Sequence, residues 1–189
     1  MNIKLPSLLV IITASLLFTG CTEKKEEHTP VQKSEKKQDV FLLQDRNISI
    51  KAKLDDDGFI FDVKEPVVML NFFATWCPPC KAEIPHLVNL QEKYRGKFKI
   101  LAVLVEENVP QRVVEKFKRD HEINYFLSNS PQNMKIAHVT ADMLHQPQNF
   151  PIPMMVLFVE GKYFRHYIGM VPEEMLESDI KDALKKVGK

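Results

Sequence analysis

The stretch that decides the fold is Asn71-Phe72-Phe73-Ala74-Thr75-Trp76-Cys77-Pro78-Pro79-Cys80-Lys81. Residues 67–73 are apolar except for Asn71, which predicts a central strand covered on both faces. Residues 79–94 follow as a helix with one apolar face. A buried strand that runs straight into two cysteines and a helix predicts an α/β domain with Cys77 at the helix N-cap.

The two cysteines have the spacing of a redox pair. Free backbone N–H groups and the positive end of the helix dipole favour a thiolate at Cys77. The thiolate is the nucleophile in disulfide exchange, and Cys80, one turn on, is within reach to resolve the mixed disulfide. A zinc site and a purely structural disulfide are the other interpretations. No second cysteine pair completes four zinc ligands, and a four-residue loop constrains the chain little, so we predict redox chemistry and no metal.

The rest of the domain is predicted to be a mixed central β-sheet flanked by helices, with an added N-terminal β-hairpin. The hairpin strands are expected over residues 40–43 and 48–52, and further strands over residues 100–105, 154–159 and 163–168. Helices are expected over residues 113–121, 131–139 and 173–186. Val113, Val114 and Phe117 are expected to face inward, and Met175 to belong to the apolar stripe of the last helix.

The N-terminus is expected to be a targeting segment. Lys4 precedes an apolar run over residues 8–18, which is shorter than the roughly 20 residues of a membrane-spanning helix. The run ends in Phe18-Thr19-Gly20-Cys21, which resembles the lipobox of bacterial lipoproteins, although that pattern usually has leucine where Phe18 stands. An ordinary signal peptide and an uncleaved anchor are the alternatives.

The chain is therefore predicted to have three parts. Residues 1–20 are a lipoprotein signal peptide, and residues 21–38 are a lipid-carrying Cys21 followed by a charged, flexible tether. Residues 39–189 form the folded domain. The resemblance to lipoproteins implies a protein of the bacterial cell envelope, held on a membrane and facing its periplasmic or other extracytoplasmic side.

The overall composition excludes several classes of protein. The 189 residues include 26 basic and 25 acidic side chains, a net charge of +1, so we expect no nucleic acid partner. Hydrophobic residues make up 44% of the chain, which is enough for a packed core. Three cysteines leave one unpaired in any arrangement, which excludes a disulfide framework. We expect one domain, a monomer and no cofactor.

The same residues resemble the thioredoxin superfamily, and within it the TlpA/ResA-like membrane-tethered thiol–disulfide oxidoreductases. The resemblance covers most of residues 40–187 and rests on the stretch quoted above, on Glu83 and Pro85, and on Ile152-Pro153 eight residues before Gly161. It implies that Pro153 is cis and lies against the cysteine pair, and that Ile152 offers its backbone to an extended substrate. The alternative is that the proline only shapes a loop.

The resemblance also implies which side chains surround the substrate. Trp76, Pro78 and Pro79 are expected on the substrate-facing surface. Glu83 is expected to act as the acid/base or pKa-setting group for Cys80, the alternative being a solvated glutamate in the first turn of the helix. Two further acidic residues, Glu106 and Glu107, follow a buried strand and either line the groove or belong to a plain loop.

The direction of the redox chemistry is predicted from the two prolines between the cysteines. Pro79 has no N–H, which leaves Cys80 as the main backbone donor to the sulfur of Cys77. A less stabilised thiolate means a more reducing couple. We therefore predict a reductase of disulfides in exported proteins, and the resemblance implies apocytochrome c as substrate and a membrane thiol carrier as electron donor.

Other functions stay open at this point. A disulfide oxidase or isomerase of exported proteins has the same fold, but the two prolines argue against the oxidase and no dimerisation domain supports the isomerase. A copper metallochaperone would hold Cu(I) through Cys77 and Cys80. A thiol peroxidase is a further alternative, although its nucleophile does not usually open a helix in this way.

Overall fold

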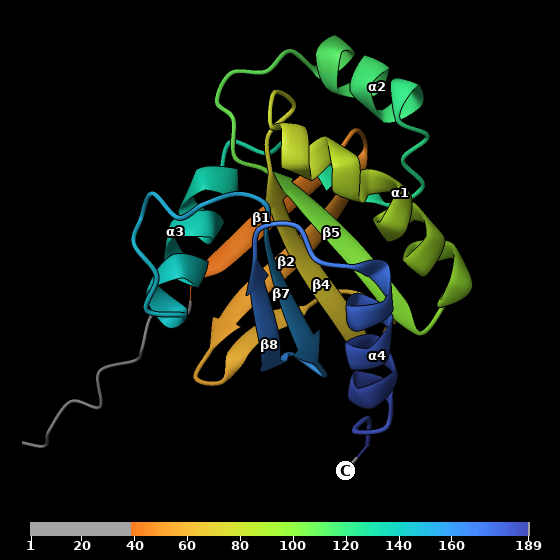
Figure 1. Cartoon of the computed structure of the whole chain (residues 1–189). Helices are drawn as coiled ribbons and strands as arrows, with labels where there is room; N and C mark the ends of the chain where they lie inside the picture. The colour runs from red at the N-terminus through yellow and green to blue at the C-terminus, as the bar shows by residue number, and fades with distance from the viewer. Residues whose placement is uncertain (1–38, 189) are drawn as a thin grey trace, which may run out of the picture. The chain divides into compact units, whose positions relative to one another are not determined.

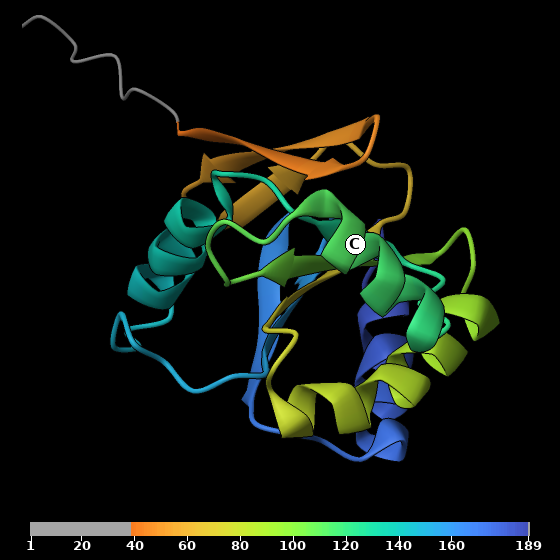
Figure 2. The ribbon, with the colours of Figure 1, turned by 90° about the horizontal axis from the view of Figure 1, so that it is seen from above.

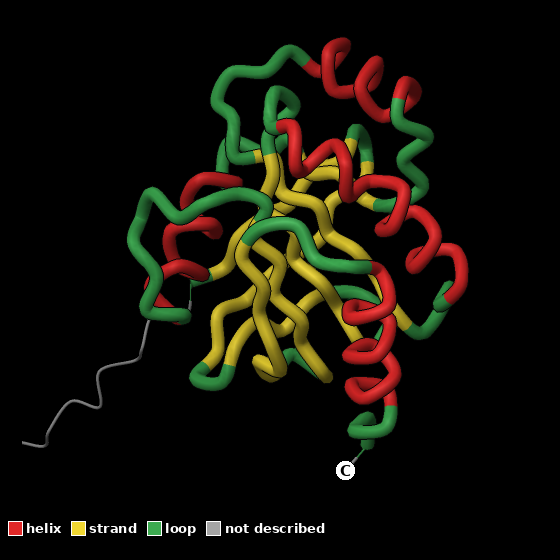
Figure 3. Tube along the Cα trace, viewed as in Figure 1, coloured by secondary structure: helices red, strands yellow, loops and turns green. Residues whose placement is uncertain are grey.

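The structure is a computed structural model that describes residues 39–188. Within these residues one sheet has the strand order β1-β2-β3-β8-β7-β4-β5-β6, and helices cover it (Figure 1, Figure 3). The strands are β1 (Val40–Asp45), β2 (Ile48–Asp55), β3 (Gly58–Phe61), β4 (Val67–Phe73), β5 (Phe98–Leu104), β6 (Phe126–Ser128), β7 (Met154–Val159) and β8 (Lys162–Ile168). The helices are α1 (Pro78–Lys93), α2 (Gln111–Asp120), α3 (Asn133–Met143) and α4 (Glu173–Leu184).

Strand β4 lies at the centre of the domain, and all of its residues are buried. It pairs in parallel with β5 and antiparallel with β7. Met69 and Phe73 face a first core with α1, α2 and α4, whereas Leu70 and Phe72 face a second core with α3 and β1–β3. In Figure 2, α1 and α4 lie on one side of the sheet and β1 and β2 cross the other. Because both faces are covered, the strand is apolar throughout.

The N-terminal strands curl the sheet until its two edges meet. β1 and β6 are the first and last strands in the spatial order. The N–H of Asn129, just after β6, donates to the carbonyl of Gln44 in β1 at 2.8 Å. The N–H of Gln44 donates to Oγ of Ser128 at 3.1 Å, and Oγ of Ser130 donates to the carbonyl of Leu42 at 2.6 Å. These bonds satisfy edge groups that would otherwise be open to another strand.

The expected α/β architecture is confirmed, including the added N-terminal hairpin formed by β1 and β2. Strands β3 and β6 were not predicted from the sequence, because each has at most four residues and neither is long enough to show a period. The division of the chain at residue 39 stays a prediction. The signal peptide, Cys21 and the tether lie outside the described residues.

Two side chains expected in the core are exposed instead. Val113 is 42% exposed and Met175 is 51% exposed. On α2 the inward face is set by Val114 and Phe117, three residues apart, so Val113 points about a quarter turn away. On α4 the buried residues are Leu176, Asp179, Ile180 and Ala183, and Met175 falls beside that stripe.

Residues 39–188 contain no helix that is both long enough and apolar enough to cross a membrane.

The second core should depend on Phe59 of β3. Its ring is fully buried and meets those of Phe41 and Phe158 edge to face, each at 5.9 Å between centroids. Replacing Phe59 by alanine should lower the free energy of unfolding by about 3–5 kcal/mol, because it opens a cavity among aromatic rings. Ile60→Ala, at the neighbouring residue that is 48% exposed, is the matched control and should cost at most about 1 kcal/mol. Urea denaturation measures both, and equal losses would contradict the assignment of Phe59 to the core.

Candidate active site

Cys77 occupies the N-cap of α1, as the sequence predicts. Its backbone is extended, with φ −78° and ψ 111°, and its sulfur accepts a hydrogen bond from the N–H of Cys80 at 3.3 Å. Pro78 and Pro79 fill the first two helical positions and have no N–H to donate. The two cysteines form a disulfide with their Cα atoms 5.3 Å apart. The first turn of α1 therefore holds both sulfurs and gives Cys77 one backbone donor.

Residues from a distant part of the chain complete the surroundings of Cys77. The peptide bond between Ile152 and Pro153 is cis, as expected, and the carbonyl of Ile152 lies 3.8 Å from Sγ of Cys77. The carbonyl of Pro153 in turn accepts from the N–H of Gly169 at 2.8 Å. This cis-proline segment follows a loop that ends at residue 151 and leads directly into β7.

The predicted substrate-facing residues differ in their exposure. Trp76 is 64% exposed, and Pro78 and Pro79 are exposed on the first turn of α1. Ile152 is partly buried against the first core, and Pro153 is buried. The disulfide itself is nearly covered, since Cys77 and Cys80 are 2% and 4% exposed. An apolar surface thus borders Cys77, and its role in binding a substrate stays a prediction.

Glu83 is buried and not solvated. It is 1% exposed and points from α1 into the first core, which excludes the alternative of a solvated glutamate in the first turn. Its Oε1 accepts from the N–H of Val171 at 3.1 Å, and its Oε2 has no hydrogen-bond partner among the described residues. Burial raises the pKa of Glu83 to about 7, and the bond from Val171 opposes that shift.

Asn71 of β4 is a second buried polar side chain, on the side of the sheet where Glu83 lies. It is 4% exposed, and its Oδ1 has no hydrogen-bond partner among residues 39–188. Asn71 faces the side of the sheet that α1 covers, because it alternates with Leu70 and Phe72 of the second core. An amide has no proton to exchange near neutral pH, so Glu83 is the titratable side chain on α1 that faces this core.

A contact that the sequence does not reveal fixes the turn before Cys77. Oε2 of Glu106 accepts from both the backbone N–H and the hydroxyl of Thr75, at 3.0 and 2.8 Å. Of the two acidic residues after β5, Glu106 therefore contacts the turn before Cys77, whereas Glu107 is exposed, and a groove lined by either residue stays a prediction. The position of Glu106 at the end of a parallel strand was the available signal, but its partner could not be read from the sequence.

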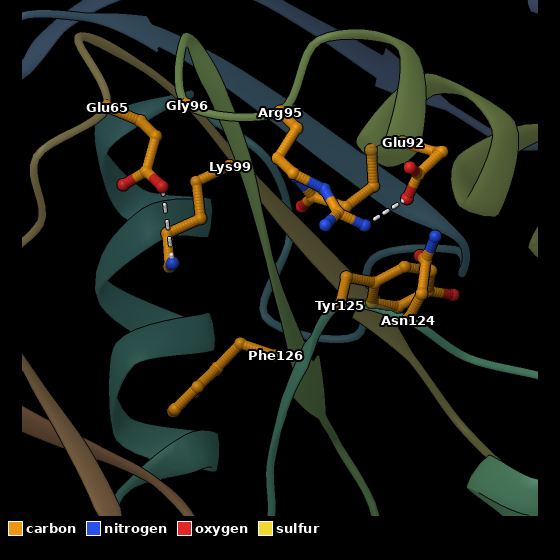
Figure 4. A pocket seen from close by; sticks show the side chains of 9 residues that line it. Glu65, Glu92, Arg95, Gly96, Lys99, Asn124, Tyr125 and Phe126 are labelled. Carbon is orange, nitrogen blue, oxygen red and sulfur yellow. Dashed lines mark hydrogen bonds and ion pairs between the residues drawn. The ribbon is translucent and has the colours of Figure 1, made fainter.

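A polar cavity lies at the opposite end of α1 from the disulfide (Figure 4). Its charged side chains pair with one another: Lys99 with Glu65 at 3.6 Å, and Arg95 with Glu92. Figure 4 also shows Tyr125 and Asn124 on the side of the cavity where Arg95 and Glu92 lie. Nothing in this lining connects the cavity with Cys77. Among residues 39–188 there is no cluster of three or more histidine, cysteine, aspartate or glutamate side chains arranged to hold a metal ion.

The chain is similar to known proteins along most of the described domain. Residues 47–158 match the model of the AhpC/TSA family. The thiol-disulfide oxidoreductase ResA of Oceanobacillus iheyensis is 30% identical over 121 residues, which are 63% of this chain and 59% of that protein. ResA of Bacillus subtilis is 28% identical over 138 residues, 72% of this chain and 68% of that protein.

A solved structure of a thioredoxin family protein, a thiol:disulfide interchange protein of Chlorobium tepidum, gives a TM-score of 0.51 at 27% identity. The superposed region covers 64% of this chain and 81% of the Chlorobium chain. The fold is therefore thioredoxin-like, with β1–β3 added before the central strands. The match spans less than two thirds of the Oceanobacillus relative.

The buried carboxyl of Glu83 should make stability depend on pH. Its pKa is raised from 4.5 to about 7, so between these values the folded chain holds a proton that the unfolded chain has released. The contribution of Glu83 is fully present below this range and falls by about 3 kcal/mol as pH rises through it. Glu83→Gln should remove this dependence and be more stable than the wild type at about pH 8.

Denaturant unfolding of the oxidised protein at about pH 5 and about pH 8 measures the effect. Glu107→Gln, at an exposed glutamate, is the matched control and should follow the wild type. Should the wild type and Glu83→Gln lose equal stability between the two pH values, the buried carboxyl would not be responsible.

Proposed function

The chain belongs to the AhpC/TSA family, and from this premise we propose that it is a thiol–disulfide oxidoreductase acting through Cys77 and Cys80. The observation that carries the proposal is the position of the Cys77 sulfur. It lies between the N-terminus of α1 and the carbonyl of Ile152, beside the exposed Trp76. The similarity to two ResA proteins named thiol-disulfide oxidoreductases supports it.

The proposed reaction moves two electrons from the reduced enzyme to a protein disulfide. The Cys77 thiolate attacks one sulfur of the substrate disulfide, whose S–S bond breaks as a mixed disulfide forms. The released substrate thiolate takes up a proton. The Cys80 thiolate then attacks Sγ of Cys77, which frees the second substrate thiolate and leaves the Cys77–Cys80 disulfide. An external dithiol must reduce this disulfide before the next cycle.

Glu83 is proposed to accept the proton of Cys80 in the second step. The two residues are three apart on α1 and both point into the first core. A carboxyl with a pKa of about 7 exchanges protons at neutral pH, as a general base for a thiol must. Its Oε2 has no hydrogen-bond partner among the described residues, so one oxygen is available for this proton.

The enzyme is proposed to work as a reductant. Helix N-termini usually offer several N–H groups to a cap, but here Pro78 and Pro79 leave the N–H of Cys80 as the donor to Cys77. A thiolate with one backbone donor gains less stability than one with several. Since the stability of the reduced form sets how oxidising a couple is, this geometry favours electron donation. An oxidase or isomerase is the alternative.

The proposed setting is the bacterial cell envelope, where the protein is held on a membrane and faces its periplasmic or other extracytoplasmic side. The lipobox-like sequence at Cys21 supports a lipid anchor, and the tether to residue 38 would let the domain meet partners at the membrane. The proposed substrates are disulfides of exported proteins, with apocytochrome c as the specific candidate. The proposed electron donor is a membrane thiol–disulfide carrier. A Cu(I) titration of the reduced protein separates this function from that of a metallochaperone.

The two cysteines should have separate roles in this reaction. Cys77→Ser should lower the rate of insulin reduction with dithiothreitol by about 100-fold or more, because serine is a far poorer nucleophile near neutral pH. Cys80→Ser should accumulate a mixed disulfide between Cys77 and the substrate, because the resolving thiol is gone.

Turbidity of the released insulin chains gives the rate, and a non-reducing gel detects the trapped complex. Cys77→Ser serves as the control for trapping, since it should form no such complex. A wild-type rate in Cys77→Ser, or a Cys80→Ser protein that traps nothing, would contradict the proposed division of roles.

A further inference from the structure

The turn that leads into Cys77 is held from the neighbouring strand by one carboxylate. Thr75 donates both of its available protons, from the backbone N–H and from Oγ1, to Oε2 of Glu106. The same turn is closed by the N–H of Cys77, which donates to the carbonyl of Ala74 at 3.2 Å. Thr75 lies inside this turn, so Glu106 restrains the backbone between the end of β4 and the N-cap of α1.

The strand register brings Glu106 to this position. β4 and β5 pair in parallel up to Phe73 and Leu104, and the N–H of Val105 donates to the carbonyl of Phe73 at 2.9 Å. Glu106 is the next residue, so its side chain lies beside the first residues after β4. It is partly buried, and no lysine or arginine among residues 39–188 forms an ion pair with it. Hydrogen bonds to an ionised acceptor are stronger than those between neutral groups.

We propose that Glu106 is a positioning residue for Cys77, which fixes the turn through Thr75 and disfavours the Cys77 thiolate through its negative charge. This inference rests on the proposed function. The two effects act on different quantities. The hydrogen bonds hold the nucleophile in place at the helix N-terminus, which raises its rate of attack. The charge repels the thiolate and so makes the thiol less acidic, in the same direction as the missing N–H groups of Pro78 and Pro79.

Glu106→Gln separates the charge from the hydrogen bonds. Glutamine keeps an oxygen that can accept both bonds from Thr75 but carries no charge. The pKa of the Cys77 thiol should fall by about half a unit, which is about a threefold larger thiolate fraction at about pH 6. Glu107→Gln makes the same change in net charge one residue away, at an exposed side chain outside the turn, and should give a clearly smaller shift.

The readout is the pH profile of iodoacetamide alkylation of Cys77 in the reduced full-length protein, followed by mass spectrometry. A Glu106→Gln profile displaced to lower pH, beyond that of Glu107→Gln, supports the electrostatic role. Coincident profiles for the two variants would overturn it. Circular dichroism of each variant checks that the fold is retained, and the alkylation profile reports on the thiol even where the rate of exchange is low.

Thr75→Val tests the hydrogen bonds without changing any charge. Valine keeps the shape of threonine but removes the hydroxyl donor, so the turn loses one of its two bonds to Glu106. The value of kcat/KM for disulfide exchange should fall by about tenfold, while the alkylation profile keeps its midpoint. Thr75→Ser keeps the hydroxyl and should recover the wild-type rate. Equal rates in all three proteins, or equal losses in both variants, would overturn the positioning role.

The design distinguishes failure of this inference from failure of the proposed function. A wild-type protein that reduces no disulfide would contradict the function, whereas the acidity of the Cys77 thiol and its response to Glu106→Gln can be measured in an inactive protein. An active wild type whose thiol is indifferent to Glu106 and whose rate is indifferent to Thr75 would contradict the inference alone.

Discussion

The antiparallel register of β4 and β7 is the constraint on which the site depends. Phe72 pairs with Met154, so the residues that follow β4 lie beside those that precede β7. Cys77 and Ile152 are 75 residues apart in sequence, yet this pairing brings the carbonyl of Ile152 close to the sulfur of Cys77. Because β4 is buried on both faces, the register cannot slip without moving apolar side chains to the wrong core. The position of the nucleophile is therefore fixed by the sheet.

The layer that buries the two cysteines also buries Glu83, the proposed proton acceptor for Cys80. Glu83 points into the first core with a single backbone donor, and that burial holds its pKa near neutrality. Asn71 on β4 has no proton to exchange, and Glu83 on α1 is the proposed acceptor for the proton of Cys80. The proposed effect of Glu106 is on the thiol of Cys77, since its carboxylate binds the turn before that residue. In the proposed mechanism, helix geometry, burial and the carboxylate of Glu106 together set how readily each thiol loses its proton.

Much of this arrangement could be predicted from the sequence, because it rests on local patterns. An apolar strand interrupted only by Asn71, two cysteines and a helix give the N-cap position of Cys77. The cis peptide bond at Pro153 was expected from the resemblance to the thioredoxin superfamily, and the structure confirms it. The place of Glu83, three residues after Cys80 on the same helix, followed from the sequence, which left open whether its side chain is solvated, and the structure shows that it is buried. What could not be predicted depends on pairing between distant segments. The bonds from Thr75 to Glu106 need the β4–β5 register, and the meeting of β1 with β6 needs the curl of the whole sheet.

The proposal that this protein is a reductant is tested most directly by the reduction potential of its Cys77–Cys80 couple. The potential follows from the ratio of oxidised to reduced protein at equilibrium with glutathione or dithiothreitol buffers. One backbone donor at Cys77 and a carboxylate beside its turn predict a poorly stabilised thiolate, and hence a potential near or below about −270 mV. A potential near about −120 mV would contradict the account, because it would mean that the reduced form is strongly stabilised and that the protein introduces disulfides.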